Sequence, residues 1–252
     1  MCCFSRPVKS VSATKIFARR SAEGRQVLVY SMKLEAPEAL AMVLPIPLAE
    51  GAKESDVRFI NLEKYPAFFE DLNSGFPVPT PGSGGFWRSR AAGPAPAALV
   101  VVQVGSFEAS FVPTVNDFSR LDERFRLPSQ SFNKLKGYAK FGFAVFKLKA
   151  GAQKVHPMAF NFPTASARLF FPTVHIHDGE VHDRADFDHD LYCQPTAEHQ
   201  LKLLDWTESR GAAGQFMKME LAQDLILKDE HCYKRTLRGR LANTDTFVEQ
   251  QN

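Results

Sequence analysis

The sequence predicts an α+β, β-rich fold, in which mostly antiparallel strands form a sandwich or a barrel-like core with a few short helices. Expected strands precede and outnumber expected helices, which disfavours the alternating strand and helix order of α/β proteins. Hydrophobic residues make up 44% of the 252 residues, enough for a sizeable buried core. Twenty-two phenylalanines against two tryptophans and five tyrosines favour apolar packing within sheets.

The amino-terminal part is expected to be built from strands. The first two runs flank Ser21-Ala22-Glu23-Gly24, a hairpin loop with a glycine near its end. Tyr65, Phe68 and Leu72 then recur at the spacing of a short amphipathic helix, over 65–72. The expected strands of this part are 14–19, 26–34, 39–44 and 57–62.

A proline- and glycine-rich stretch follows at 76–96. Its five prolines and four glycines disfavour regular structure, and we expect a surface loop or a lid. We interpret residues 1–252 as a single domain, which this loop could divide into halves, 1–75 and 97–247.

The carboxyl-terminal part is again expected to be rich in strands. A helix is expected at 115–121, capped by Thr114, and another at 130–138. The spacing of Leu201, Leu204 and Trp206 predicts a helix that ends at 206. The expected strands are 97–104, 107–112, 141–148, 155–162 and, as a basic terminal strand, 232–241.

The most informative segment is rich in histidine. Five of the seven histidines lie between positions 175 and 199. Asp178-Gly179 is a strong signal for a two-residue hairpin turn, because both turn residues need positive φ. With the turn there, side chains that alternate along each strand place four polar residues on one face. These four residues are His175, His177, Glu180 and His182.

This face predicts a metal site. Directly opposed residues in a hairpin have Cβ atoms ~4.5–5.5 Å apart. Three imidazoles with one carboxylate suit zinc, copper or iron, and leave a position open for water or substrate. We expect His175, His177 and His182 as ligands, Glu180 as fourth ligand or general base, and Cys193 as a sulfur ligand. The chain would then be a metalloenzyme of hydrolytic or redox chemistry; a merely polar hairpin face is the alternative.

Asp186, Asp188 and Asp190 follow at every second position. The pattern is similar to the start of an EF-hand calcium loop, but Leu191 stands where that loop requires glycine. We therefore expect no calcium loop here. We expect His189, among these aspartates, to be exposed or to support a ligand from behind.

Cys2 indicates a different class of enzyme. Loss of Met1 would leave Cys2 with a free α-amine, which resembles the N-terminal-nucleophile amidohydrolases and glutamine amidotransferases. The resemblance implies Cys2 as the nucleophile and a substrate-orienting role for Arg19 and Arg20. Cys3 replaces the glycine that many such amidotransferases have next. A third interpretation is a non-catalytic assembly or interaction module.

Charge and composition limit the classes of binding partner that the sequence predicts. The formal net charge of +3 is spread along the chain, so binding to nucleic acid or to a membrane surface is not indicated. No run reaches the ~18–20 apolar residues of a membrane span, and no apolar signal segment is evident. Four cysteines do not form a disulfide framework, so we expect a cytoplasmic protein. A small-molecule or peptide substrate and the oligomeric state are left open.

Overall fold

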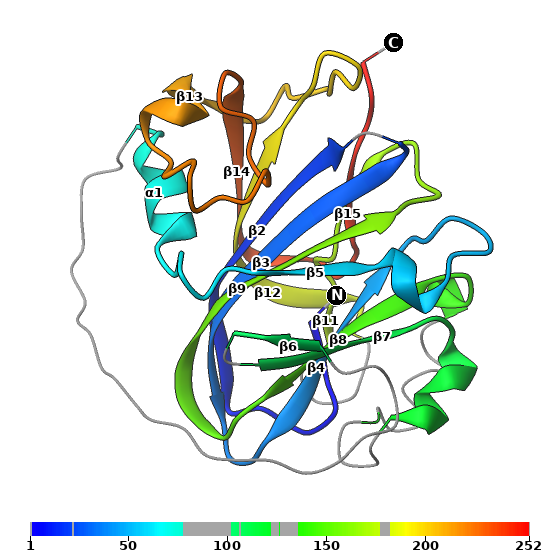
Figure 1. The fold of residues 1–252 in the computed structure, drawn as a ribbon. Coiled ribbons are helices and arrows are strands. Elements are labelled where there is room, and N and C mark those ends of the chain that lie inside the picture. Colours follow the sequence, from blue (N-terminus) through cyan, green and yellow to red (C-terminus); the bar gives the residue numbers. More distant parts are fainter. Residues whose placement is uncertain are drawn as a thin grey trace.

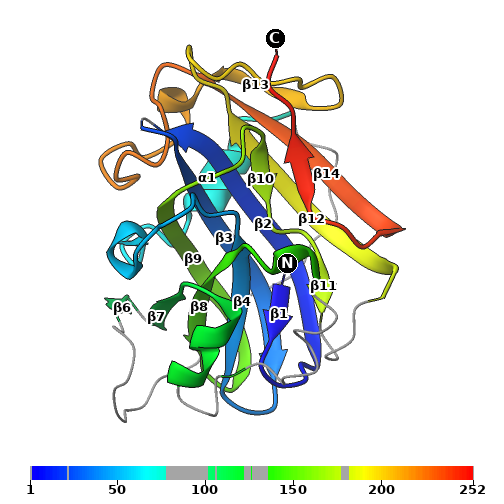
Figure 2. The same ribbon diagram turned by 90° about the vertical axis from the view of Figure 1, so that its right-hand side faces the viewer.

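Two mostly antiparallel sheets pack face to face in the computed structural model (Figure 1 and Figure 2), which confirms the predicted β-rich class. The structure describes residues 2–21, 23–77, 102–105, 107–121, 126, 136–176 and 182–251, without the side chains of Cys2, Val102, Lys136 and residues 152–155. Much of the loop at 76–96 therefore lies outside the described residues, and the division into two halves stays a prediction.

Each sheet combines strands from distant parts of the sequence. Parallel pairs join β1 to β11 and β2 to β12. The larger sheet has the order β13 (Thr207–Ala212), β14 (His231–Ala242), β12 (Arg184–Gln194), β2 (Ser10–Ser21), β3 (Arg25–Ala36), β9 (Gly151–Pro163) and β5 (Arg58–Asn61). The smaller sheet has the order β11 (His175–Ile176), β1 (Cys2–Phe4), β4 (Leu40–Ile46), β8 (Gly142–Leu148), β7 (Phe107–Val112) and β6 (Val102–Val104). A separate pair consists of β10 (Leu169–Phe171) and β15 (Thr246–Val248).

Both sheets are covered on both faces over much of their area. In β2, Ile16 lies in the core between the sheets, whereas its neighbour Phe17 lies in a second cluster on the outer face. In β4, Met42 and Leu44 join the core between the sheets, and Val43 joins a third cluster outside. Strands buried on both faces have continuous apolar sequences, which is why these runs do not alternate with polar residues.

Short helices cover the outer faces. The helix expected at 65–72 is confirmed as α1 (Phe68–Ser74), which packs on the larger sheet (Figure 1). The helix expected at 115–121 is a 3-10 helix, η2 (Val115–Arg120), in which the Thr114 amide donates to Asp117 Oδ2 at 3.1 Å. Of the helix expected at 130–138, the described residues form η4 (Lys136–Tyr138). The remaining 3-10 helices in the described residues are η1 (Glu54–Asp56) and η5 (Ala213–Gln215).

The helix expected to end at Trp206 is wrong. Thr196 and His199 form a turn, and Leu201 bridges to Gln250 near the end of the chain. Leu201 is 6% exposed and contributes to the core, whereas Leu204 is 97% exposed. The apolar residues of this segment therefore do not share one buried face, and pairing with a distant strand prevails over local spacing.

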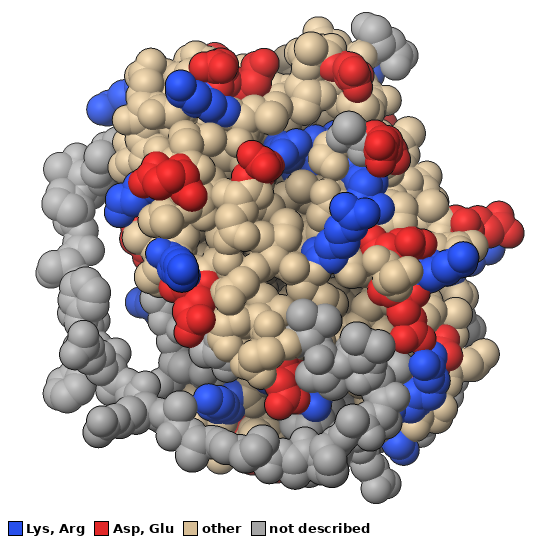
Figure 3. Space-filling model, viewed as in Figure 1, with Lys and Arg blue, Asp and Glu red and all other residues tan. Residues whose placement is uncertain are grey.

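The surface shows charges of both signs. On the face seen in Figure 3, lysine and arginine side chains are interspersed with aspartates and glutamates. Within the described ranges, no helix has the length and apolar character needed to cross a membrane.

Candidate functional site

Two histidines from different sheets form a close pair. His175 in β11 and His189 in β12 approach with their Nε2 atoms 3.2 Å apart. The ring of Phe187 packs against both, with centroid distances of 4.5 Å to His175 and 5.1 Å to His189. One nitrogen must donate and the other accept, so at least one of the two imidazoles is neutral. His189 is 1% exposed, so the expectation of an exposed histidine there is wrong.

Asn243 fixes the ends of the histidine-rich segment. Its Nδ2 donates to the carbonyl oxygens of His175 and His182, each at 2.9 Å, and its Oδ1 accepts the His175 amide at 2.7 Å. Asn243 thus bridges the backbones of His175 and His182, but no strand pairing between these two residues is found in the described structure, where His175 pairs with Cys2. His177 and Glu180, at the expected turn, lie outside the described residues.

The predicted metal centre is wrong. Among the described residues, no three histidine, cysteine, aspartate or glutamate side chains lie close enough together to hold a metal ion. His175 faces His189, while the side chain of His182 is exposed. Cys193 is buried further along β12, which begins at Arg184 and runs between β14 and β2. The metalloenzyme interpretation, with zinc, copper or iron as cofactor, fails with this centre.

The described cysteines are buried thiols. Cys193 and Cys232 are both inaccessible, and Cys3 is 1% exposed. Burial raises the pKa of Cys193 well above its ordinary value and that of Cys232 to about 12, so both resist conversion to the reactive thiolate. Cys2 lies in β1, where its backbone pairs with that of His175. The roles of Cys2 as nucleophile and Glu180 as base stay predictions.

Oppositely charged rows run along β12 and β14. Arg238 Nη2 lies 3.0 Å from Asp190 Oδ1, and Lys234 Nζ lies 3.4 Å from Asp190 Oδ2. Further along, Arg240 Nη1 lies 3.8 Å from Asp186 Oδ2. The alternating aspartates are therefore the acidic row of a sheet, because every second residue of a strand lies on the same face.

The outer edge of β14 is long and has no strand partner over much of its length among the described residues. Strand β13 pairs with β14 through His231, Tyr233 and Lys234. From Arg235 to Ala242, β14 pairs with β12 on one side, and no strand among the described residues pairs with the other side. Figure 2 shows β14 along the margin of the molecule. The sequence predicted this basic strand. It could not predict the free edge, because that depends on how strands from distant parts of the sequence are arranged in the sheet.

The side chains along this edge differ between the two faces of the strand. Arg238 and Arg240 lie on the charged face, whereas Leu237 packs against the core between the sheets. The side chain of Arg235 makes no hydrogen bond or ion pair with the described residues, while its backbone pairs with Leu191. The edge thus combines unpaired main chain, basic side chains and partly buried apolar side chains.

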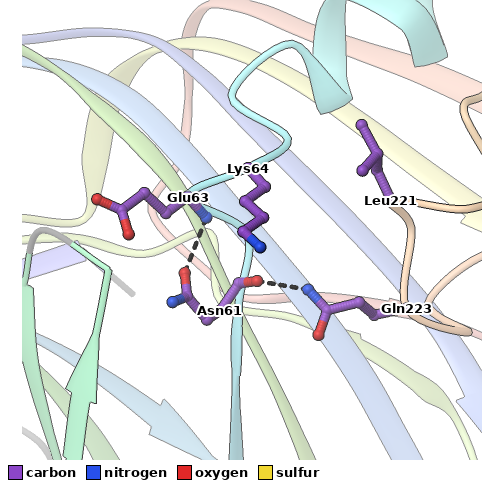
Figure 4. Close-up of a pocket in the computed structure, with 5 residues that line it drawn as sticks. All are labelled: Asn61, Glu63, Lys64, Leu221 and Gln223. Carbon is purple, nitrogen blue, oxygen red and sulfur yellow. Dashed lines mark hydrogen bonds between the residues drawn. The ribbon is translucent and has the colours of Figure 1, made fainter.

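A shallow hollow lies between the end of β5 and the loop at 221–226 (Figure 4). Its volume is about 340 Å³, and Gln223 Nε2 donates to the Asn61 carbonyl oxygen across it. Gln223 and Asp224 both have left-handed backbones, with φ of 48° and 58°, which non-glycine residues rarely adopt. The five lining residues include no cysteine, serine or histidine: Asn61, Glu63, Lys64, Leu221 and Gln223.

Comparisons with known proteins find similarity in structure. No protein-family model matches the sequence, and no curated protein matches it. The crystal structure of baculovirus P35 is 11% identical, covers 100% of both chains and gives a TM-score of 0.49. P35 in a caspase-8/P35 complex is 10% identical, covering 95% of this chain and 96% of that chain, with a TM-score of 0.48. A mutated P35 after caspase cleavage is 13% identical, covering 95% and 100%, with a TM-score of 0.46. Structural similarity at such low sequence identity concerns the fold and not the activity.

Proposed function

We propose that this protein is a non-catalytic interaction module that binds an extended segment of a partner protein along the outer edge of β14. The observation that carries the proposal is the edge from Arg235 to Ala242, with which no strand in the described part of the chain pairs. An open edge presents a row of amide and carbonyl groups to which another strand can add.

The chemistry of the edge specifies the occupant. Arg238 and Arg240 on one face favour acidic side chains in the partner. Arg235 lies on the opposite face, with Leu237, and its side chain makes no ion pair within the described residues. Leu237 on the other face is partly buried against the core and favours apolar side chains. Because side chains alternate along a strand, the preferred segment alternates acidic and apolar residues.

A second copy of the chain is a poor occupant. Antiparallel pairing of two β14 edges would bring two arginine-rich rows opposite each other, and like charges directly opposite destabilise a sheet. Charged side chains on edge strands also prevent indiscriminate edge-to-edge association. The arginines therefore exclude basic and self-pairing strands while admitting an acidic one.

The test is a fluorescence anisotropy titration with labelled eight-residue peptides. The protein is expected to bind a peptide of alternating valine and glutamate, and to bind the matched valine and lysine peptide at least ~tenfold more weakly. A valine and glutamate peptide N-methylated along one edge should also bind weakly, because it lacks the amide donors that a paired strand supplies.

Charge-reversal variants locate the binding. Arg235→Glu/Arg238→Glu should abolish binding of the acidic peptide, while Arg168→Glu, at an exposed arginine outside the edge, should leave it unchanged. Equal binding of all three peptides, or undiminished binding by the edge variant, would show that the edge is merely a protected margin of the sheet.

A second readout uses caspase-8, the protease in one of the P35 complexes. Its cleavage of a fluorogenic peptide is measured with and without this protein and the same two variants. If this protein inhibits the protease and the edge variant inhibits equally well, then the β14 edge is not where that partner docks.

A further inference from the structure

We propose that Arg20 binds a carboxylate from outside the described chain, in a pocket at the end of β2. The proposal is independent of the β14 edge. Arg20 is 8% exposed, yet no aspartate or glutamate among the described residues forms an ion pair with it. A guanidinium stays charged in proteins, and a buried charge without a counter-charge is strongly disfavoured.

The hydrogen bonds of Arg20 are incomplete. Its Nη1 donates to the Ser166 carbonyl oxygen at 2.8 Å. Its Nε is fully covered and has no hydrogen-bond partner within the described part of the chain. The side chain of Gln26, paired with Arg20 across the sheet, is occupied by the backbone of Phe170. Within the described residues, the Arg20 side chain thus contacts one carbonyl dipole, whereas its positive charge would need a full negative charge to balance it.

Arg20 lines a pocket of about 320 Å³ that also receives positive potential from Arg19. Arg19 is 7% exposed, and it donates to the carbonyl oxygens of Leu225 at 2.8 Å, of Arg20 at 3.0 Å and of Asp224. These carbonyl contacts orient Arg19, whose charge is also favoured by that of Asp224. Burial lowers the pKa of both arginines from their ordinary values, the direction expected for a poorly solvated cation.

Other lining groups select the ligand. Ser21 Oγ accepts from Asn161 Nδ2 at 3.3 Å, which leaves its hydroxyl proton for an acceptor in the pocket. Glu198 and Glu230 also line the pocket, are exposed and form no ion pair with either arginine in the described structure. These rim carboxylates repel a doubly charged anion more strongly than a singly charged one. The expected ligand is therefore a carboxylate rather than a phosphate.

Such a carboxylate has two sources, a free small acid or the end of a peptide chain. Isothermal titration calorimetry at constant ionic strength uses acetate, inorganic phosphate, and a tripeptide with a free or an amidated carboxyl terminus. Acetate and the free-acid peptide should bind, whereas phosphate and the amidated peptide should not. A free-acid peptide that binds at least ~tenfold more tightly than acetate identifies a polypeptide source, and equal affinities identify a small acid.

Variants tie the binding to Arg20. Arg20→Gln should weaken acetate binding by at least ~tenfold, because a hydrogen bond to a charged group is lost. Arg58→Gln is the control, since Arg58 is an exposed arginine in β5 that does not line the pocket, and the acetate affinity of this variant should equal that of the parent protein.

A second variant, which should gain phosphate binding, tests the proposal even if Arg20→Gln does not fold. Glu198→Gln removes one rim carboxylate and should bring phosphate affinity up to that of acetate. Identical heats for acetate and chloride in the parent protein would overturn the proposal, as would acetate binding that persists in Arg20→Gln. Unchanged rejection of phosphate by Glu198→Gln would overturn the assigned selectivity.

Discussion

At the scale of single residues, His156 shows how burial sets a protonation state. Its ring stacks on Phe107 with a centroid distance of 3.9 Å, and its Nε2 lies against Gly105, where a Cβ atom would be 2.9 Å away. Burial lowers the pKa of His156, opposed by a hydrogen bond to the Pro157 carbonyl and by the charge of Glu63. The folded protein therefore favours the neutral ring.

This predicts a dependence of stability on pH. Because the unfolded chain binds a proton at His156 more readily than the folded chain, stability decreases as the pH falls below about 6.5, the ordinary histidine value. His156→Phe should reduce that decrease in urea-unfolding measurements between pH 7 and pH 5. Replacement of an exposed histidine, His182→Asn, is the control; equal slopes for His156→Phe and the parent protein would contradict the prediction.

Cysteine reactivity is predicted by burial as well. Cys3, Cys193 and Cys232 should resist iodoacetamide in the folded protein and react in urea, as peptide mass spectrometry can determine. Cys2 is expected to be alkylated first. Early labelling of Cys193 would show that its core position opens readily.

The histidine pair shows what the sequence could and could not predict. The cluster was visible, but the aspartates around His189 suggested exposure. The period of two assigns Asp188 and Asp190 to the charged face and His189 to the opposite, buried face, so the signal was present locally. That His189 meets His175 from another sheet depends on long-range pairing, for which the sequence contains no local signal.

At the scale of elements, Asn243 joins the end of β14 to the start of both β11 and β12. Its amide donates to two carbonyl groups and its oxygen accepts one amide, all with a side chain that is 8% exposed. A buried amide with three hydrogen bonds is difficult to replace, because an isosteric carboxylate cannot donate.

Asn243→Asp should therefore lower the free energy of unfolding by about 1–3 kcal/mol, the cost of leaving buried groups unpaired. Hydrogen exchange at the His175 amide should accelerate at the same time. Asn116→Asp, at an exposed asparagine, is the matched control. If Asn243→Asp has the same unfolding midpoint as the parent protein, then water replaces the lost hydrogen bonds of Asn243 without a loss of stability.

At the scale of the whole molecule, aromatic side chains join the two sheets. Phe160 in β9 lies 5.9 Å from Phe146 of the opposite sheet and 5.8 Å from Phe162, measured between ring centroids. All three are fully buried. The excess of phenylalanine thus correctly predicted a sheet core, but composition could not assign the strand order, which joins segments more than a hundred residues apart.

Phe160→Ala should lower the free energy of unfolding by ~3–5 kcal/mol, because it removes the ring and leaves a cavity between the sheets. Leu204→Ala, at a side chain that is 97% exposed, should change it by less than ~0.5 kcal/mol. Urea titration followed by circular dichroism measures both; similar effects for the two variants would contradict the assigned core.

The parallel pair of β2 and β12 has a consequence for synthesis on the ribosome. Strand β2 pairs with β3 as soon as that hairpin emerges, but its other neighbour, Arg184–Gln194, is translated much later. The nascent chain therefore carries an open strand edge in the middle of its future sheet for most of its translation. Chains that depend on such distant contacts fold slowly and expose aggregation-prone edges meanwhile. We expect this protein to need a chaperone during translation more than its modest size suggests.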